Sequence, residues 1–165
     1  MDAARRGFLR GRPRNIVRVP RPPWAGAEGA FQNLCTRCDA CIDACPTKIL
    51  KPGDGGYPTV DFSNAECTFC GDCATACESG AIKRVEGQAA WDMSARLGEA
   101  CIAGKGVECR ICGELCAVGA IRFRPVPGGI SRPALERESC TGCGACVAPC
   151  PVDAIVVGYP MESGR

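Results

Sequence analysis

The spacing of the cysteines constrains this chain more than any other feature. Sixteen of the 165 residues are cysteine, and they form four motifs of four. Motifs one, two and four have the spacing C-x2-C-x2-C-x3-C, whereas motif three has seven residues in its first gap. In chain order the motifs are Cys35, Cys38, Cys41 and Cys45; Cys67, Cys70, Cys73 and Cys77; Cys101, Cys109, Cys112 and Cys116; and Cys140, Cys143, Cys146 and Cys150.

This spacing is used for [4Fe–4S] clusters in bacterial ferredoxins, where the fourth cysteine ligates the neighbouring cluster. Two-residue gaps let one tight loop reach three irons, while the fourth cysteine enters a short helix and points away. The crossing predicts four sites that use all sixteen cysteines, and we expect four [4Fe–4S] clusters per chain. Site one is Cys35, Cys38, Cys41 and Cys77; site two is Cys67, Cys70, Cys73 and Cys45; site three is Cys101, Cys109, Cys112 and Cys150; site four is Cys140, Cys143, Cys146 and Cys116.

Three other interpretations of the cysteines stay open. Structural zinc also uses C-x2-C pairs, although it needs two pairs rather than a triplet and one. Disulfides at this density would need an oxidising compartment. In motif three, Cys101 could be a spare thiol, which would leave its cluster with three ligands or absent. Gly104 and Gly106 favour the alternative in which the long loop bulges outward and Cys101 still reaches iron.

The second half of the chain repeats the first, at offsets of 71 and 73 residues. Each motif is followed by an apolar pair that we expect to start a short strand: Ile49-Leu50, Ala81-Ile82, Ala120-Ile121 and Ala154-Ile155. The glycine-rich segments 53–56 and 128–129 indicate hairpin turns. We therefore expect an α+β, duplicated bacterial ferredoxin-like fold, with two units of short helices and β-hairpins that each surround two clusters. The expected divisions are a basic flexible arm (1–30), a first unit (31–88), a linker helix (89–100) and a second unit (101–160).

Composition limits both the stability of the chain and its chemistry. Leu, Ile, Val and Phe total 31 of 165 residues, which is few for a self-sufficient core. Metal ligation can supply the missing folding free energy. The chain has no histidine, which excludes a Rieske-type centre and an imidazole base, and it has no glycine-rich nucleotide loop. We therefore expect an iron–sulfur protein that is not an enzyme. We expect neither nucleic-acid binding nor stable membrane insertion, since no apolar run reaches transmembrane length.

Charge is unevenly distributed along the chain. Residues 1–30 carry a net charge of +5 and the remainder −3. Since an oxidised cluster with its four thiolates carries about −2, the body becomes acidic when clusters bind. The opening resembles a twin-arginine signal, but Arg and Pro follow it instead of an apolar run, so we expect a cytoplasmic protein. The arm is predicted to dock a protein partner, although it could also fold over its own body or remain a solvated tail; the candidate contacts are Arg5, Arg6, Phe8, Leu9 and Arg10.

The basic opening Arg5-Arg6-Gly7-Phe8-Leu9-Arg10-Gly11, the four motifs, the stretched third motif and the length together resemble the NapF family of ferredoxin-type proteins. That family belongs to the periplasmic nitrate reductase system. The resemblance implies a cytoplasmic protein that acts on the molybdenum-containing catalytic subunit NapA before its export, in assembly or loading of its iron–sulfur centre. The alternative is an electron-transfer subunit of a larger oxidoreductase.

Overall fold

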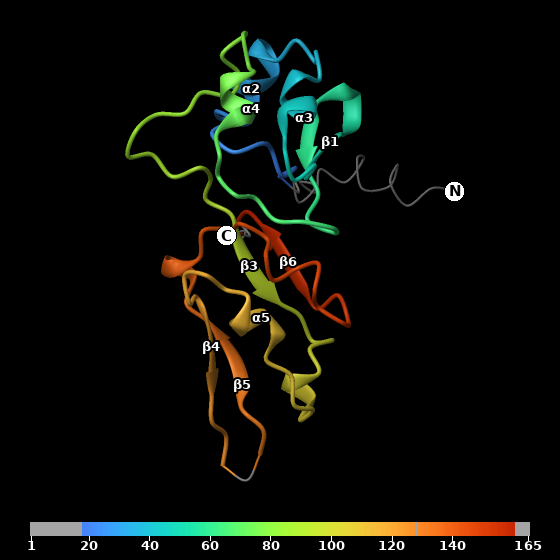
Figure 1. Cartoon of the computed structure of the whole chain (residues 1–165), viewed down its shortest axis with the longest axis vertical. Coiled ribbons are helices and arrows are strands. Elements are labelled where there is room, and N and C mark those ends of the chain that lie inside the picture. Colours follow the sequence, from blue (N-terminus) through green and yellow to red (C-terminus); the bar gives the residue numbers. More distant parts are fainter. Residues whose placement is uncertain (1–17, 128, 161–165) are drawn as a thin grey trace, which may run out of the picture.

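The computed structural model describes residues 18–127 and 129–160. Figure 1 shows them as two lobes stacked along the long axis, with α2, α3, α4 and β1 in the upper lobe and α5 and β3 to β6 in the lower one. The helices assigned in these residues have only four to seven residues each. None of them is long and apolar enough to cross a membrane.

In its described residues the upper lobe consists of short helices and one hairpin. Its elements are α2 (Glu28–Leu34), α3 (Ala40–Ala44), β1 (Leu50–Pro52), the 3-10 turn η1 (Asp54–Gly56), β2 (Pro58–Val60) and α4 (Asp72–Thr75). Strands β1 and β2 are antiparallel, with Leu50 opposite Val60. The turn η1 joins them, which confirms the hairpin expected at the first glycine-rich segment.

The lower lobe, as far as it is described, adds two antiparallel strand pairs to one short helix. Its elements are β3 (Ser94–Leu97), the 3-10 turn η2 (Ala103–Lys105), α5 (Ile111–Glu114), β4 (Ile121–Arg124), β5 (Arg132–Leu135), the 3-10 turn η3 (Arg137–Ser139) and β6 (Ile155–Gly158). Strand β4 pairs with β5 in a hairpin, with Ile121 opposite Leu135, and β3 pairs with β6, with Leu97 opposite Ile155. Both lobes therefore combine short helices with antiparallel strands, the mixed architecture that the motifs predicted.

The apolar pairs after the four motifs occupy equivalent places. Strands β1, β4 and β6 begin at Leu50, Ile121 and Ile155. After motif two, Ile82 forms a single antiparallel bridge with Ala25 instead of a longer strand. All eight side chains of the pairs are buried, each at most 4% exposed. The expected strand starts are confirmed after motifs one, three and four, whereas only this bridge forms after motif two.

The linker helix expected over residues 89–100 is wrong, because strand β3 lies in that segment. Ser94 and Ala95 are buried in the strand, which pairs with β6 over four residues. The backbone amide of Ala95 donates a hydrogen bond to Cys140 Sγ at 3.4 Å. These contacts come from residues far along the chain and outweigh the weak helical propensity of the local sequence.

The prediction of a flexible arm over residues 1–30 is wrong for the part from residue 20 onward. Residues 1–17 lie outside the described residues, but the chain from residue 20 onward packs on the upper lobe. Pro22 and Pro23 are buried, and Trp24 is only 8% exposed. Helix α2 begins at Glu28, so the expected boundary at residue 31 falls inside a helix.

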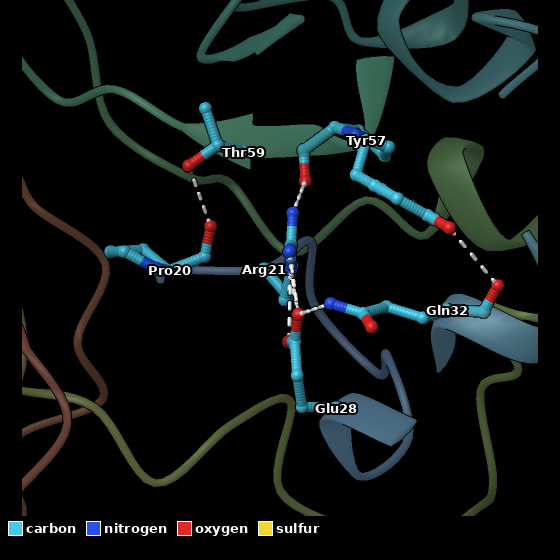
Figure 2. A network of polar contacts seen from close by, with 7 residues as sticks. Pro20, Arg21, Glu28, Gln32, Tyr57 and Thr59 are labelled. Atoms are coloured by element: carbon cyan, nitrogen blue, oxygen red, sulfur yellow. Dashed lines mark hydrogen bonds and ion pairs between the residues drawn. The ribbon is translucent and has the colours of Figure 1, made fainter. Parts of the chain in front are cut away.

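A network of polar contacts around Arg21 fastens this segment (Figure 2). The Arg21 side chain is 7% exposed and donates hydrogen bonds to both carboxylate oxygens of Glu28 and to the Pro58 carbonyl of β2. Its guanidinium lies 5.3 and 5.5 Å from the ring centres of Phe31 and Tyr57. The mutual hydrogen bonds raise the pKa of Arg21 and lower that of Glu28. Because the charge is partnered, a basic and proline-rich segment can be buried here.

One hydrophobic core extends through both lobes. It includes Phe31 and Leu50 from the upper lobe and Met93 and Ile155 from the lower one. Of its nineteen buried members, six are cysteine, two are alanine, and the other eleven are of the Ile, Leu, Val, Phe, Trp and Met types. Buried cysteines are thus part of the core and lie among these apolar side chains.

Candidate iron–sulfur cluster sites

Four cavities lie among the cysteines. Each cavity is lined by three cysteines of one motif and one cysteine of the partner motif. The sets are Cys35, Cys38, Cys41 and Cys77; Cys67, Cys70, Cys73 and Cys45; Cys101, Cys109, Cys112 and Cys150; and Cys140, Cys143, Cys146 and Cys116. The structure therefore brings together the four groups that the crossing rule defined as sites one to four.

Short helices direct neighbouring cysteines to different sites. Helix α3 carries Cys41, which lines site one, and Cys45 directly after the helix lines site two. Helix α4 does the reverse, with Cys73 at site two and Cys77 at site one. Four residues advance a helix by about 6 Å, so the two members of each pair reach separate cavities. The lower lobe repeats the arrangement around α5.

Backbone amides donate hydrogen bonds to the cysteines that cross over. In three motifs the donor belongs to the apolar pair that follows, with Ile82 to Cys77 at 3.3 Å, Ala120 to Cys116 at 3.2 Å and Ala154 to Cys150 at 3.3 Å. The same pairs line the cavities with their side chains. Amide hydrogen bonds to sulfur favour the thiolate, and they are one means by which a protein sets the reduction potential of a cluster.

Burial makes the innermost thiols hard to ionise in the absence of a bound group. It raises the pKa of five of them: Cys41, Cys67 and Cys112 to about 11, and Cys73 and Cys146 to about 12. At the exposed Cys38, in contrast, a backbone hydrogen bond from Ala40 lowers the pKa. Since thiolates bind metal, filling these cavities must release protons.

The stretched first gap of motif three forms a turn over site three. After Cys101 the chain forms η2, in which Ala103 is only 1% exposed. Ile102 and Ala103 line the cavity together with Cys101. Gly106 closes the turn with a φ of 87°, a left-handed conformation that glycine adopts readily. The inserted residues therefore leave Cys101 at the cavity, as the bulged-loop interpretation expects.

The chemistry of the lining fits an iron–sulfur cluster. All sixteen cysteines lie in the described part of the chain, and all are free of disulfide bonds. In that part of the chain no three His, Cys, Asp or Glu side chains are grouped so as to hold a single metal ion. Instead, four thiols surround each empty volume, and apolar side chains such as Ile49, Phe123 and Val157 complete the lining. A bulky group with four thiolate ligands suits such a cavity better than one ion does.

Sequence reasoning missed the contribution of the N-terminal segment to the sites. Pro23 and Trp24 line site two, and Phe31 lines site one. The only local signal was the apolar run at Pro22-Pro23-Trp24 within a basic segment. The predicted partner-binding residues lie outside the described residues, and they are Arg5, Arg6, Phe8, Leu9 and Arg10.

Comparisons with known proteins agree with this geometry. A family model described as a 4Fe-4S dicluster domain matches residues 34–81 and again residues 105–154. The chain is therefore a ferredoxin-type iron–sulfur protein with two such domains. It is 50% identical to the ferredoxin-type protein NapF of Escherichia coli (strain K12) over 159 residues, which are 96% of each chain. The chain belongs to the NapF family of ferredoxin-type proteins.

Two further relatives show how widely this plan occurs. The ferredoxin-type protein NapF of Haemophilus influenzae is 40% identical over 164 residues, which are 93% of this chain and 92% of the relative. The methylamine utilization ferredoxin-type protein MauM of Methylobacillus flagellatus is 34% identical over 175 residues, which are 95% of this chain and 75% of the relative. Similarity thus extends along nearly the whole chain in each case.

Proposed function

We propose that the chain holds four [4Fe–4S] clusters, one in each site, on a duplicated bacterial ferredoxin-like fold with all sixteen cysteines as ligands. The observation that carries this proposal is the set of four cavities, each lined by the four cysteines that the crossing rule groups. A bound cluster supplies one-electron redox chemistry. The thiolates bind it, the apolar pairs keep water from it, and the amides that donate to sulfur stabilise the ligands.

Metal and sulfide analysis of the reconstituted protein tests this proposal. Four clusters correspond to about 16 iron and about 16 sulfide per chain, since each holds four of both. A content near 12 of each would limit the proposal to three sites. Stoichiometric zinc without sulfide would refute it.

We further propose that the protein is a cytoplasmic accessory factor and not an enzyme. Its task is to assist maturation of the molybdenum-containing nitrate reductase catalytic subunit NapA before export, by iron–sulfur loading or electron supply. Membership of the NapF family supports this role. Sixteen cysteines without disulfides are also typical of a reducing compartment.

The N-terminal arm offers a test of partner recognition. Its opening combines arginines, which pair bidentately with carboxylates, with Phe8 and Leu9 as apolar anchors. We expect that deletion of residues 1–17 weakens capture of the NapA precursor, and that the difference shrinks at high salt because exposed charge pairs are screened. The deletion stops before Arg21, since that residue fastens the upper lobe. Equal capture by the full and shortened chains would assign recognition to the cluster-bearing body.

A second candidate function is that of an electron-transfer subunit within a larger oxidoreductase. The relative named for methylamine utilization favours it, since similarity over nearly the whole chain then extends to a protein of a system with a different name. Stable, stoichiometric co-purification with other redox subunits would support this function. Transient binding to an export-competent precursor would support maturation instead.

A further inference from the structure

The two lobes meet where sites two and four lie. The backbone amide of Cys67 in the upper lobe donates a hydrogen bond to the carbonyl of Cys143 in the lower lobe at 2.8 Å. Cys67 lines site two and Cys143 lines site four. Inside each lobe, a single helical turn separates the two sites. Contacts along the molecule therefore run from site one to two, across to four, and on to three.

An aromatic cluster packs between the two lobes at this point. The ring of Trp91 packs edge-on against Phe62 and Phe69 of the upper lobe, with centroid distances of 6.1 and 5.7 Å. Its Nε1 donates a hydrogen bond to the carbonyl of Thr141 in motif four at 2.8 Å. Trp91 thus contacts the loops that carry both Cys67 and Cys143, and a polar and an apolar contact orient it.

Two glycines allow the loop of site four to come this close. A Cβ at Gly142 would lie 2.5 Å from the Met93 carbonyl oxygen and 2.6 Å from Trp91 Nε1, and a Cβ at Gly144 would overlap the Phe62 ring. Both glycines also have positive φ, 71° and 85°. These two positions flank Cys143, so its loop rests directly on the aromatic cluster with no side chain between.

All four sites have solvent-exposed lining, with Cys70 at site two and Val118 at site four exposed, and the two ends of this series are therefore accessible as well. Cys38, which lines site one, is exposed. At site three the lining includes Ile111 and Val152, which are 37% and 36% exposed. A redox partner can therefore approach the first and last sites without rearrangement of the fold.

We propose that the four sites form one electron path in the order one, two, four, three, and that Trp91 positions the junction between the lobes. The proposal rests on the proposed function, because it needs clusters in the sites. An electron enters from a low-potential one-electron donor at one end and leaves to a one-electron acceptor at the other. No bond forms or breaks, and no proton is required. Without the junction, the chain would act as two separate pairs of sites.

Electron paramagnetic resonance of the dithionite-reduced protein tests the order of the sites. One variant keeps only sites two and four, through alanine at Cys35, Cys38, Cys101 and Cys109. The other keeps only sites one and three, through alanine at Cys67, Cys70, Cys140 and Cys143. Both should retain about 8 iron per chain, four for each cluster. We expect broadened, spin-coupled signals from sites two and four, and isolated signals from sites one and three. Coupling only in the protein with sites one and three would overturn the order.

The Trp91→Ala substitution in the full chain tests the junction while every cysteine stays in place. Tyr57→Ala is its control, because Tyr57 is also a partly buried aromatic residue but lies on the hairpin of the upper lobe. Both variants should keep the wild-type iron content, and only Trp91→Ala should reduce the spin coupling. Unchanged coupling in Trp91→Ala would overturn the role of this residue. Loss of iron from the wild-type protein would instead refute the proposed function, so the two failures are distinguishable.

Discussion

In each lobe, the segment before the first cysteine pairs with the segment after the last cysteine. We call this pairing the closure of the lobe, and the two lobes form it by different interactions. In the lower lobe, β3 and β6 form a ladder of four residue pairs. In the described part of the upper lobe, the corresponding pairing is the bridge between Ala25 and Ile82, and the contacts of Arg21 hold the segment in place.

The comparison indicates that similar cysteine sites do not require one kind of closure. A strand ladder is held by several backbone hydrogen bonds, which a single side-chain substitution does not remove. The closure of the upper lobe depends on one buried guanidinium and its partners, so it is vulnerable to a single substitution. We therefore expect the two lobes to respond alike to changes at the cysteines and differently to changes in the closing segments.

Removal of the clusters should have the largest effect and should abolish the difference between the lobes. Strong chelation or oxidative loss is expected to unfold residues 31–160, because the apolar core is too small to stand alone. Circular dichroism and amide hydrogen exchange, resolved by lobe, would measure this. An apo-form that melts cooperatively with native secondary structure in either lobe would contradict the expectation.

Replacement of the first cysteine of a site should remove one cluster from either lobe. Cys101→Ser in the stretched motif and Cys35→Ser in a compact motif are each expected to lower the iron content from about 16 to about 12 per chain. Quantitative iron analysis compares the two directly. If Cys101→Ser alone retained the full content, Cys101 would be a spare thiol after all.

Substitution of Arg21 should destabilise the closure of the upper lobe and leave that of the lower lobe intact. Arg21→Ala removes hydrogen bonds between charged groups and is expected to destabilise the upper lobe by about 2 kcal/mol. The control is Arg96→Ala on β3, whose side chain donates one hydrogen bond to the Tyr159 carbonyl at 3.4 Å. That change should cost less than about 1 kcal/mol, since the ladder remains. Hydrogen exchange of the cluster-loaded protein measures both, and equal costs would show that the closures are equivalent.

Shortening the N-terminus should have the smallest effect on the fold. Deletion of residues 1–17 retains the contacts of the segment from Pro20 to Ala25, so iron content and thermal stability should stay at the wild-type values. Deletion of residues 1–30 removes these contacts, Arg21 included, and should destabilise the upper lobe by more than Arg21→Ala does. A loss of iron on the shorter deletion would show that the cluster sites need residues before Arg18.

The sequence alone was enough to predict the four groups of cysteines that line the cavities. Gaps of two and three residues restrict which irons a cysteine can reach, so local spacing predicted that Cys77 joins the first site and Cys45 the second. The buried apolar pair after each motif was also predictable, because it lies within five residues of the last cysteine. These features depend on contacts between near neighbours in the chain.

Only the tertiary structure decided how the lobes close and how they meet. The strand character of Ser94–Leu97 arises from Ile155–Gly158, about sixty residues later, and its local sequence resembled a helix. The burial of Arg21 depends on the Pro58 carbonyl and on Glu28, which composition cannot reveal. The junction at Trp91 likewise requires the two glycines of motif four. Such contacts join distant segments, and their free energy exists only once the chain has folded around its cysteines.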